Sequence, residues 1–231
     1  MPVQTNNLLL AGLGGRIRRD LLNGVEPVEL HAAQQIWAAG ERARLAVFPI
    51  DCSISLLLEV RNEPTVDAGL IGNEGMLGVP LVLGMPICAF HAIVQGPGRA
   101  WCVDGAHLGA TLERHAPLRQ RLNRYVCARM MQLAQGAGCR GSHRVEARLA
   151  RWLLMSKDRA DSDELMLTHE LLARMLGVRR AGVTIAAHDL QERRLIRYAR
   201  GRIVVLDVHG LEAAACPCYA QEKKTYARLM G

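Results

Sequence analysis

Aromatic side chains are scarce in this 231-residue chain: only 4% of its residues are Phe, Trp or Tyr, although 50% are hydrophobic. A chain of this length exceeds the usual domain size of about 100–150 residues and can bury one or two cores. Because large rings are few, these cores must be built mainly from Leu, Val, Ile, Ala and Met. We therefore expect a folded protein, most simply one of two domains.

Cysteine pairs of the CxxC type are missing. The cysteines stand at positions 52, 88, 102, 127, 139, 216 and 218, and no apolar segment of the signal-peptide kind follows a basic start, so we expect a cytoplasmic protein with reduced thiols. Cys216 and Cys218, on either side of Pro217, could be a thiol pair or half of a metal site. Structural burial is the commoner role of a lone CxC, and we predict no metal site.

Charged residues are absent from Gly75 to Gly98, and these 24 residues could in length cross a bilayer. Glycines and prolines interrupt the stretch, however, and His91 lies inside it. We expect buried strands and turns here, and no membrane partner.

Catalytic motifs are also missing. The chain has no GxSxG, Walker-type loop, HExxH or paired-carboxylate arrangement, and the segment 72–75 lacks the strand–loop–helix context that would hold a phosphate. We expect no enzymatic activity.

Charge is distributed unevenly along the chain. Residues 1–113 hold 7 Lys and Arg against 11 Asp and Glu, a net charge of −4, whereas residues 114–231 hold 22 against 11, a net charge of +11. One basic end is expected where a protein meets a polyanion. Nucleic acid is the first candidate and a membrane surface is the second, while a basic protein without a polyanionic partner stays open.

Short apolar runs rich in β-branched residues fill residues ~25–103, separated by Gly and Pro turns and by the turn at 61–64. This pattern is typical of several short antiparallel strands in a sandwich or roll. The period then becomes helical, with a short helix over 104–115.

A longer helix is predicted from about Leu118 to Gln135, and the glycines at 136, 138 and 141 are expected to end it. One apolar stripe runs along this helix. Such a stripe packs on its own domain or forms the seam of a dimer, since a helix that links two domains is not fully covered by either. We assign to dimerisation Leu118, Leu122, Val126, Met130 and Leu133.

Two short helical patterns follow, joined by a glycine. Thr168 is a good N-cap for the first, and Gly177 suits the left-handed position that ends it. The second, over ~179–191, buries Val183, Ala187 and Leu190 on one face and therefore exposes a face with Arg180, Thr184 and His188. Two such helices form a helix-turn-helix, and Arg179 and Arg180 stand where the second helix would enter a major groove.

Two short strands, Leu195–Tyr198 and Ile203–Leu206, are predicted next, on either side of a basic turn that contains Arg200 and Arg202. A hairpin in this position is a wing. Together with the charge asymmetry and the linking helix, it favours binding to double-stranded DNA.

The segments LTHELLARMLGVRRAGVT, LIRYARGRIVVLD and GLEAAACPCY resemble, in order and spacing, the winged helix of the Crp/Fnr family of bacterial transcription regulators, and AGLIGNEGMLGVPLVLG resembles the sensor domain of that family. The resemblance implies an α+β fold: an N-terminal antiparallel β-roll like that of cyclic-nucleotide-binding domains, a long dimerisation helix and a C-terminal winged helix-turn-helix. We place these parts at 1–106, 107–137 and 138–231. It further implies a homodimer on a roughly palindromic site, contact with RNA polymerase, and possible control by an unidentified effector.

The family pattern makes Arg180 the groove-reading arginine and places Thr168 and His169 at phosphates and Arg200 and Arg202 in the wing. In the best-known members a Glu and a further Arg stand where this chain has Ala181 and Ile185, so the familiar operator sequence is not expected. The predicted DNA-binding residues are Thr168, His169, Arg179, Arg180, Thr184, His188, Arg200 and Arg202.

Nucleotide-binding members hold the cyclic phosphate with an arginine close after a Gly-Glu pair. Here no Arg or Lys lies between Asn62 and Gly98, so cyclic AMP or GMP is not expected. No cysteine precedes Cys52, which argues against an N-terminal iron–sulfur cluster, and nothing supports haem ligation by His91, His107 or Cys102. We expect no cofactor. The competing function is a dimer that binds a small molecule or partner protein and has no DNA function.

Overall fold

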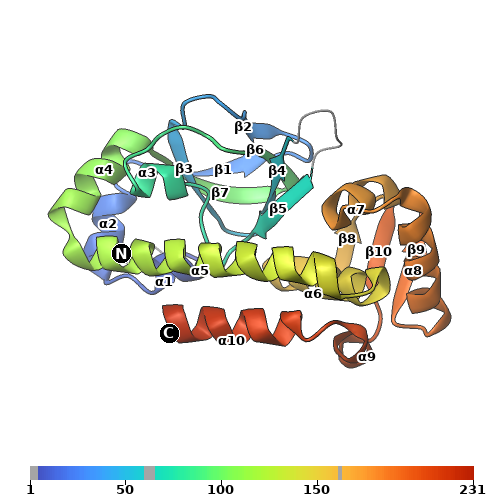
Figure 1. The fold of residues 1–231 in the computed structure, drawn as a ribbon. Helices are drawn as coiled ribbons and strands as arrows, with labels where there is room; N and C mark the ends of the chain where they lie inside the picture. Colours follow the sequence, from blue (N-terminus) through green and yellow to red (C-terminus); the bar gives the residue numbers. More distant parts are fainter. Residues whose placement is uncertain (1–4, 60–65, 161–162) are drawn as a thin grey trace.

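The computed structural model describes residues 5–59, 66–160 and 163–231. Figure 1 shows a β-rich part at one end, a long helix running beneath it, and a smaller helical part with a three-stranded sheet at the other end. The predicted α+β fold class is confirmed. The turn predicted at 61–64 lies outside the described residues.

The β-rich part consists of two antiparallel sheets, with strand orders β1-β7-β3 and β2-β6-β4-β5. Buried side chains such as Val47, Ile54 and Val94 belong to the core of this roll. The predicted strand runs correspond to β3, β4, β5 and β6. The strands are β1 Pro27–Leu30, β2 Gln35–Trp37, β3 Leu45–Pro49, β4 Ser53–Leu58, β5 Val66–Ile71, β6 His91–Gly96 and β7 Gly98–Asp104.

The uncharged stretch 75–98 is not made of buried strands and turns alone, which corrects the prediction. It contains a short helix, α3 (Val79–Val82), with a proline in its first turn. The loop after it exposes Leu83, Met85 and Ile87 at 56%, 69% and 56%. Gly84, with φ of +69°, takes a left-handed conformation that turns the chain and so ends the helix. Within the described residues, no helix combines the length and the apolar character that a bilayer crossing needs.

Short helices pack beside the roll and fill a second core. Leu9 and Leu10 are fully buried there, together with Leu108 and Tyr125. These helices are α1 Leu8–Ala11, α2 Gly15–Leu21 and α4 Gly105–Arg114.

The linking helix α5 runs from Ala116 to Ser142 and thus continues past the three glycines that were predicted to end it. Each glycine costs a helix only about 1 kcal/mol relative to alanine. Tertiary contacts favour the extra turns, because Cys139 is buried against Cys216 and Cys218, and the C-terminal helix α10 (Cys218–Met230) lies alongside α5 (Figure 1).

The predicted dimerisation stripe of α5 divides into two parts. Leu118 and Leu122 are fully buried in the core of their own subunit, so they are not available to a partner, which corrects that part of the prediction. Val126 is half-buried. Met130 and Leu133 are exposed at 65% and 39%.

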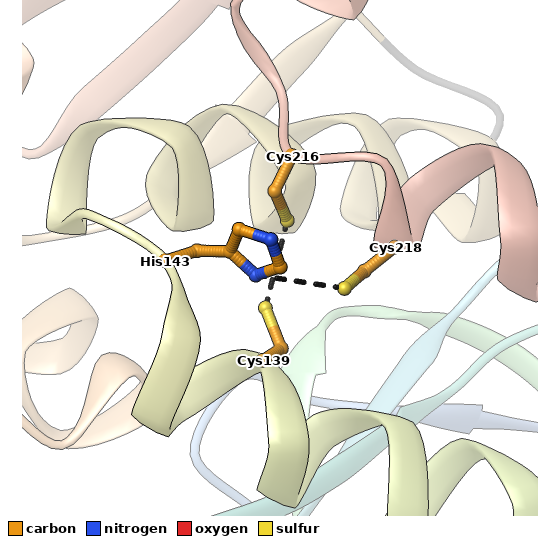
Figure 2. A group of neighbouring side chains, drawn as sticks. All are labelled: Cys139, His143, Cys216 and Cys218. Atoms are coloured by element: carbon orange, nitrogen blue, oxygen red, sulfur yellow. Dashed lines mark hydrogen bonds between the residues drawn. The ribbon is translucent and has the colours of Figure 1, made fainter.

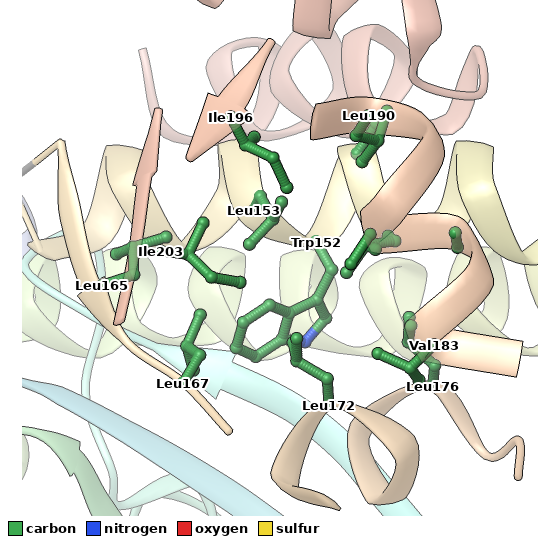
Figure 3. Close-up of a cluster of buried hydrophobic side chains, with 14 of the residues drawn as sticks. Trp152, Leu153, Leu165, Leu167, Leu172, Leu176, Val183, Leu190, Ile196 and Ile203 are labelled. Atoms are coloured by element: carbon green, nitrogen blue, oxygen red, sulfur yellow. The ribbon is translucent and has the colours of Figure 1, made fainter. Parts of the chain in front are cut away.

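The C-terminal part packs helices and a small sheet, ordered β8-β10-β9, around Trp152. Figure 3 shows Leu167 from the segment between β8 and α7, Leu172 from α7 and Ile203 from β10 around this ring. Strand β8 was not predicted, because three residues with a single buried side chain show no usable alternation. The elements are α6 Val145–Ala160, β8 Glu164–Met166, α7 His169–Leu176, α8 Arg180–Glu192, β9 Ile196–Ala199, β10 Arg202–Val205 and α9 Val208–Ala214.

Candidate nucleic-acid interface

The helix-turn-helix forms as its local sequence predicts. The Oγ1 atom of Thr168 accepts a hydrogen bond from the backbone N–H of Leu171 at 3.1 Å and caps α7. Gly177 ends this helix in the left-handed region, with φ of 61° and ψ of 46°. The backbone N–H of Val178 then donates to the carbonyl of Ala173 at 3.0 Å. This turn directs α8 away from α7.

Helix α8 has the predicted two faces. Val183, Ala187 and Leu190 are 0%, 2% and 0% exposed and belong to the core around Trp152. The opposite side exposes Arg180, at the first position of α8, and Thr184 and His188 one and two turns later. Arg179, at the N-cap, is also exposed, so both arginines project from the end of the helix that would enter a groove.

Ile185 is a surface residue that the sequence reading did not select. It is 72% exposed on α8, next to Thr184. Its exposure could have been predicted, because Ile185 lies outside the apolar face of the helical pattern. On a helix that lies in a major groove, an exposed isoleucine can contact the methyl group of a thymine.

The wing is a tight hairpin. Strand β10 pairs antiparallel with β9, and Arg202 lies opposite Ala199. Arg200 and Gly201 between them have φ values of 51° and 78°, as in the two-residue turns that match the twist of paired strands. The carbonyl of Gly201 accepts the N–H of Leu167 at 2.7 Å. The wing tip is therefore fastened beside the start of α7.

The two wing arginines have different surroundings. Arg200 is exposed at the turn. Arg202 is 56% exposed in its side chain, and its Nη1 atom lies 2.7 Å from an Oε1 oxygen of Glu164 on strand β8. A phosphate that approaches Arg202 therefore also meets a carboxylate.

His169 connects the three elements of the interface. Its ring stacks on Tyr198 of the wing, with centroids 4.2 Å apart and planes at 17°. Its Nδ1 lies 3.0 Å from the Oγ1 of Thr184, which itself donates to the carbonyl of Arg180 at 3.1 Å. Because the hydroxyl proton is used there, Nδ1 of the neutral ring carries its proton and donates to Thr184. His169 thus positions the start of α8.

The charge of His169 is suppressed in this setting. Partial burial and the nearby positive charge of Arg180 both lower the pKa of the imidazole below its ordinary value. A neutral ring can stack on Tyr198 and hydrogen-bond Thr184, whereas a protonated ring would place a second cation beside Arg180.

The predicted residues thus fall into one connected group and one outlying residue. Contacts join Thr168, His169, Thr184 and the wing: a Cβ on Gly201 would lie 3.4 Å from the Cγ2 of Thr168. His188 lies farther along α8, and its Nε2 is 3.9 Å from a carboxylate oxygen of Glu192.

A chain of alternating charges joins the β-roll to the C-terminal part. Arg159 of α6 donates from Nε to Glu74 at 2.9 Å and from Nη2 to Glu222 of α10 at 3.0 Å. Arg151 donates to the other oxygen of Glu222 at 2.6 Å. Burial alone would raise the pKa of Glu222, but the two arginines hold it below its ordinary value. Glu74, in the Gly-rich segment of the β-roll, is thus neutralised by an arginine from α6.

Residues 147–214, from α6 to α9, match the family of Crp-like helix-turn-helix domains. The match covers the C-terminal part of the chain, which is therefore a Crp-like helix-turn-helix domain. No curated protein sequence matches the chain significantly.

Solved structures of this family share the fold of the chain. FixK2 from Bradyrhizobium japonicum has a TM-score of 0.71 at 13% identity and covers 83% of this chain and 98% of its own. A CRP-family transcriptional regulator from Thermus thermophilus, TTHB099, has a TM-score of 0.68 at 18% identity over 81% and 96%. The c-di-GMP-responsive regulator CLP from Xanthomonas campestris has 0.67 at 15% identity over 83% and 99%.

Proposed function

We propose that this regulator binds DNA as a homodimer on a roughly palindromic site, with one α8 helix in each of two successive major grooves. The observation that carries the proposal is the exposure of Arg179 and Arg180 at the start of α8, in a domain whose wing is fastened beside the start of α7. Two-fold symmetry would separate the two helices by about 34 Å, one turn of B-DNA.

An exposed face of α5 supports the dimer. Its positions recur at alternating intervals of three and four residues, which is the spacing of a coiled-coil seam. They are apolar or small and exposed in the single chain, and Met130 is the largest of them. The proposed seam consists of Cys127, Met130, Ala134, Ala137 and Gly141. This seam differs from the predicted stripe: it does not include Leu118 and Leu122, and Leu133 lies at its edge.

Specificity and affinity have separate sources in this proposal. Arg180 would read a guanine edge, with Arg179, Ile185 and His188 at neighbouring bases. Thr168 and the wing arginines would contact phosphates, which fix the register and make affinity depend on salt. Thr184 and His169 contact each other, so we assign them mainly to positioning α8.

The test is selection of bound duplexes from a random pool. The proposal expects enriched sites with two inverted half-sites whose centres lie about 10–10.5 base pairs apart. A direct repeat or a single half-site would contradict the dimer geometry. Absence of any shift of operator-length DNA, even at low salt, would favour a small-molecule- or partner-binding dimer instead.

We further propose that the β-roll does not take a cyclic nucleotide. The Gly-Glu segment has no arginine of its own, and Glu74 is already paired with Arg159. Titration with cyclic AMP, cyclic GMP and c-di-GMP, the last because CLP responds to it, should leave DNA affinity unchanged. Contact with RNA polymerase and the lack of enzymatic activity stay predictions.

A further inference from the structure

Three cysteines and one histidine lie close together next to the DNA-binding domain. Figure 2 shows the side chains of Cys139, His143, Cys216 and Cys218 pointing toward one another, the first two from the end of α5 and the others from the segment before α10. Their ligand atoms all lie within 4.8 Å of one another, and the three cysteines are buried. The sequence predicted no metal site, because its local pattern shows Cys216 and Cys218 but not that Cys139 and His143 lie beside them.

The local chain geometry produces this cluster. Cys139 and His143 are four residues apart at the end of a helix and so lie on one face. The N–H of Cys216 donates to the carbonyl of Ala147 at 3.2 Å, and the N–H of Tyr219 donates to the carbonyl of Cys216 at 3.1 Å. The first bond holds the Cys-Pro-Cys segment against the first turn of α6, which directly follows α5, and the second forms a turn within the segment.

Two separations between the ligand atoms match those expected around one tetrahedral ion. Zn–S bonds of about 2.3 Å and a Zn–N bond of about 2.0 Å, at tetrahedral angles, place neighbouring ligand atoms about 3.5–3.8 Å apart. The Sγ atoms of Cys139 and Cys216 are 3.5 Å apart. The Sγ of Cys218 and the Nδ1 of His143 are 3.7 Å apart. Three cysteines and one histidine are a known ligand set of structural zinc sites.

Surrounding groups suit an ion bound by thiolates. The Nε2 of Gln135 donates to the Sγ of Cys218 at 2.9 Å, as outer-shell donors do at metal sites. The Nη1 of Arg151 lies 4.0 Å from the Sγ of Cys139. Three thiolates and a divalent cation carry a net charge of −1, which Arg151 can balance.

The position of the cluster suggests its effect. The matched helix-turn-helix domain spans 147–214, so two ligands lie just before it and two just after it. One ion would join both ends of the DNA-binding domain and fix them to the linking helix α5.

We propose that Cys139, His143, Cys216 and Cys218 bind one thiophilic divalent ion per chain, with Zn²⁺ as the physiological class, and that this ion fastens the DNA-binding domain to the linking helix. The proposal does not depend on which DNA site is bound. Metal uptake is measured without DNA, so its failure leaves the proposed DNA function intact.

The test is a Co²⁺ titration of the full-length, reduced and chelator-treated protein. Tetrahedral Co²⁺ with thiolate ligands gives ligand-field bands in the visible range and a charge-transfer band in the near ultraviolet. We expect both to saturate at one equivalent per chain and to vanish when Zn²⁺ is added. Octahedral spectra, or no saturable binding by the reduced protein, would overturn the proposal.

Variants locate the site. Cys216→Ser and Cys218→Ser should each lower the Zn²⁺ affinity at least about 100-fold, more than the roughly 10- to 100-fold loss expected from the outer-shell change Gln135→Ala. Cys102→Ser is the matched control, since Cys102 is a half-buried cysteine of strand β7 outside the cluster, and this variant should bind Zn²⁺ like the wild type. Circular dichroism identifies any variant that fails to fold.

A variant that misfolds is replaced by His143→Gln, which removes a half-buried ligand. Equal Zn²⁺ affinity in the folded ligand variants and the wild type would overturn the proposal. A Cys139–Cys216 disulfide, seen by mass spectrometry, would do so as well if the protein takes up no metal after reduction.

Discussion

The arginines of the C-terminal part fall into two groups with opposite surroundings. Arg129, Arg148 and Arg159 are 6%, 7% and 6% exposed and lie at the junction with the β-roll. Arg179 and Arg180 are exposed at the start of α8. The first group is held by carbonyls and carboxylates of its own chain, for example Arg129 by the carbonyl of Leu70 at 3.2 Å, whereas the second is available to an external anion.

This difference shows that the net positive charge of the C-terminal half has two uses. The buried arginines fasten the two parts of the molecule together, and the exposed ones belong to the proposed DNA interface. The amino-acid composition counts buried and exposed arginines alike. A charge asymmetry read from sequence therefore overstates the part that can neutralise phosphate, and substitutions should separate the two groups.

The largest expected effect is on stability, at Arg159. Arg159→Ala removes the shared partner of the half-buried Glu74 and the buried Glu222. Arg151 still pairs with Glu222, but breaking largely buried pairs in this way costs about 3–5 kcal/mol. Urea unfolding measures the change. Arg179→Ala should stay within about 0.5 kcal/mol of the wild type. Equal losses in both variants would remove the distinction between the two groups.

Arg180→Ala should have the next largest effect, on DNA binding and not on folding. We expect a loss of about 1–3 kcal/mol on the selected site and a relaxed preference at one base pair of each half-site. Competition binding against single-base variants of the site measures this. If random DNA loses as much affinity as the selected site, Arg180 is a phosphate contact and its assignment is wrong.

The wing arginines provide a finer comparison. Arg200→Ala should weaken binding to all sequences alike and reduce the slope of log affinity against log salt by about 1. Arg202→Ala should weaken binding more, because it also removes the positive charge that lies between the carboxylate of Glu164 and the DNA. The double variant Arg202→Ala/Glu164→Gln should regain part of the loss, and no recovery would refute the role of Glu164.

The smallest expected effect is a pH dependence at His169. Because the folded protein lowers the pKa of this imidazole below its ordinary 6.5, the unfolded chain takes up the proton first. The contribution of His169 to stability is therefore present above about pH 6.5 and is lost as the pH falls below that value toward the lowered pKa. Unfolding curves between about pH 7.5 and 5 should be flatter in pH for His169→Gln than for the wild type.

The interface was largely predictable because its signals are local. Thr168 and Gly177 mark the ends of α7, and the spacing of Val183, Ala187 and Leu190 fixes which face of α8 is exposed. The wing was predicted from two short strands on either side of a turn that contains a glycine. Such features depend on neighbours within a few residues, which a single sequence displays.

The contacts that join the C-terminal part to the β-roll and to α5 were not predictable in the same way. Arg159 and Glu74 are 85 residues apart, and Cys139 and Cys216 are 77 apart, so no local pattern links them. Tertiary contacts also carried α5 past its glycines, which propensity alone predicts would end it. What the sequence could not supply was the pairing of distant segments.

The path of α10 has a practical consequence for anyone who handles this protein. The guanidinium of Arg121 donates to the carbonyl of Leu9 at 2.9 Å and to that of Met230 at 3.4 Å, and Figure 1 shows both marked chain ends on the side of the molecule away from α8. An affinity tag or fluorescent label at either terminus would thus leave the proposed DNA-binding surface uncovered. It would lie close to the hydrogen bonds by which Arg121 joins α1 to α10 and could weaken them.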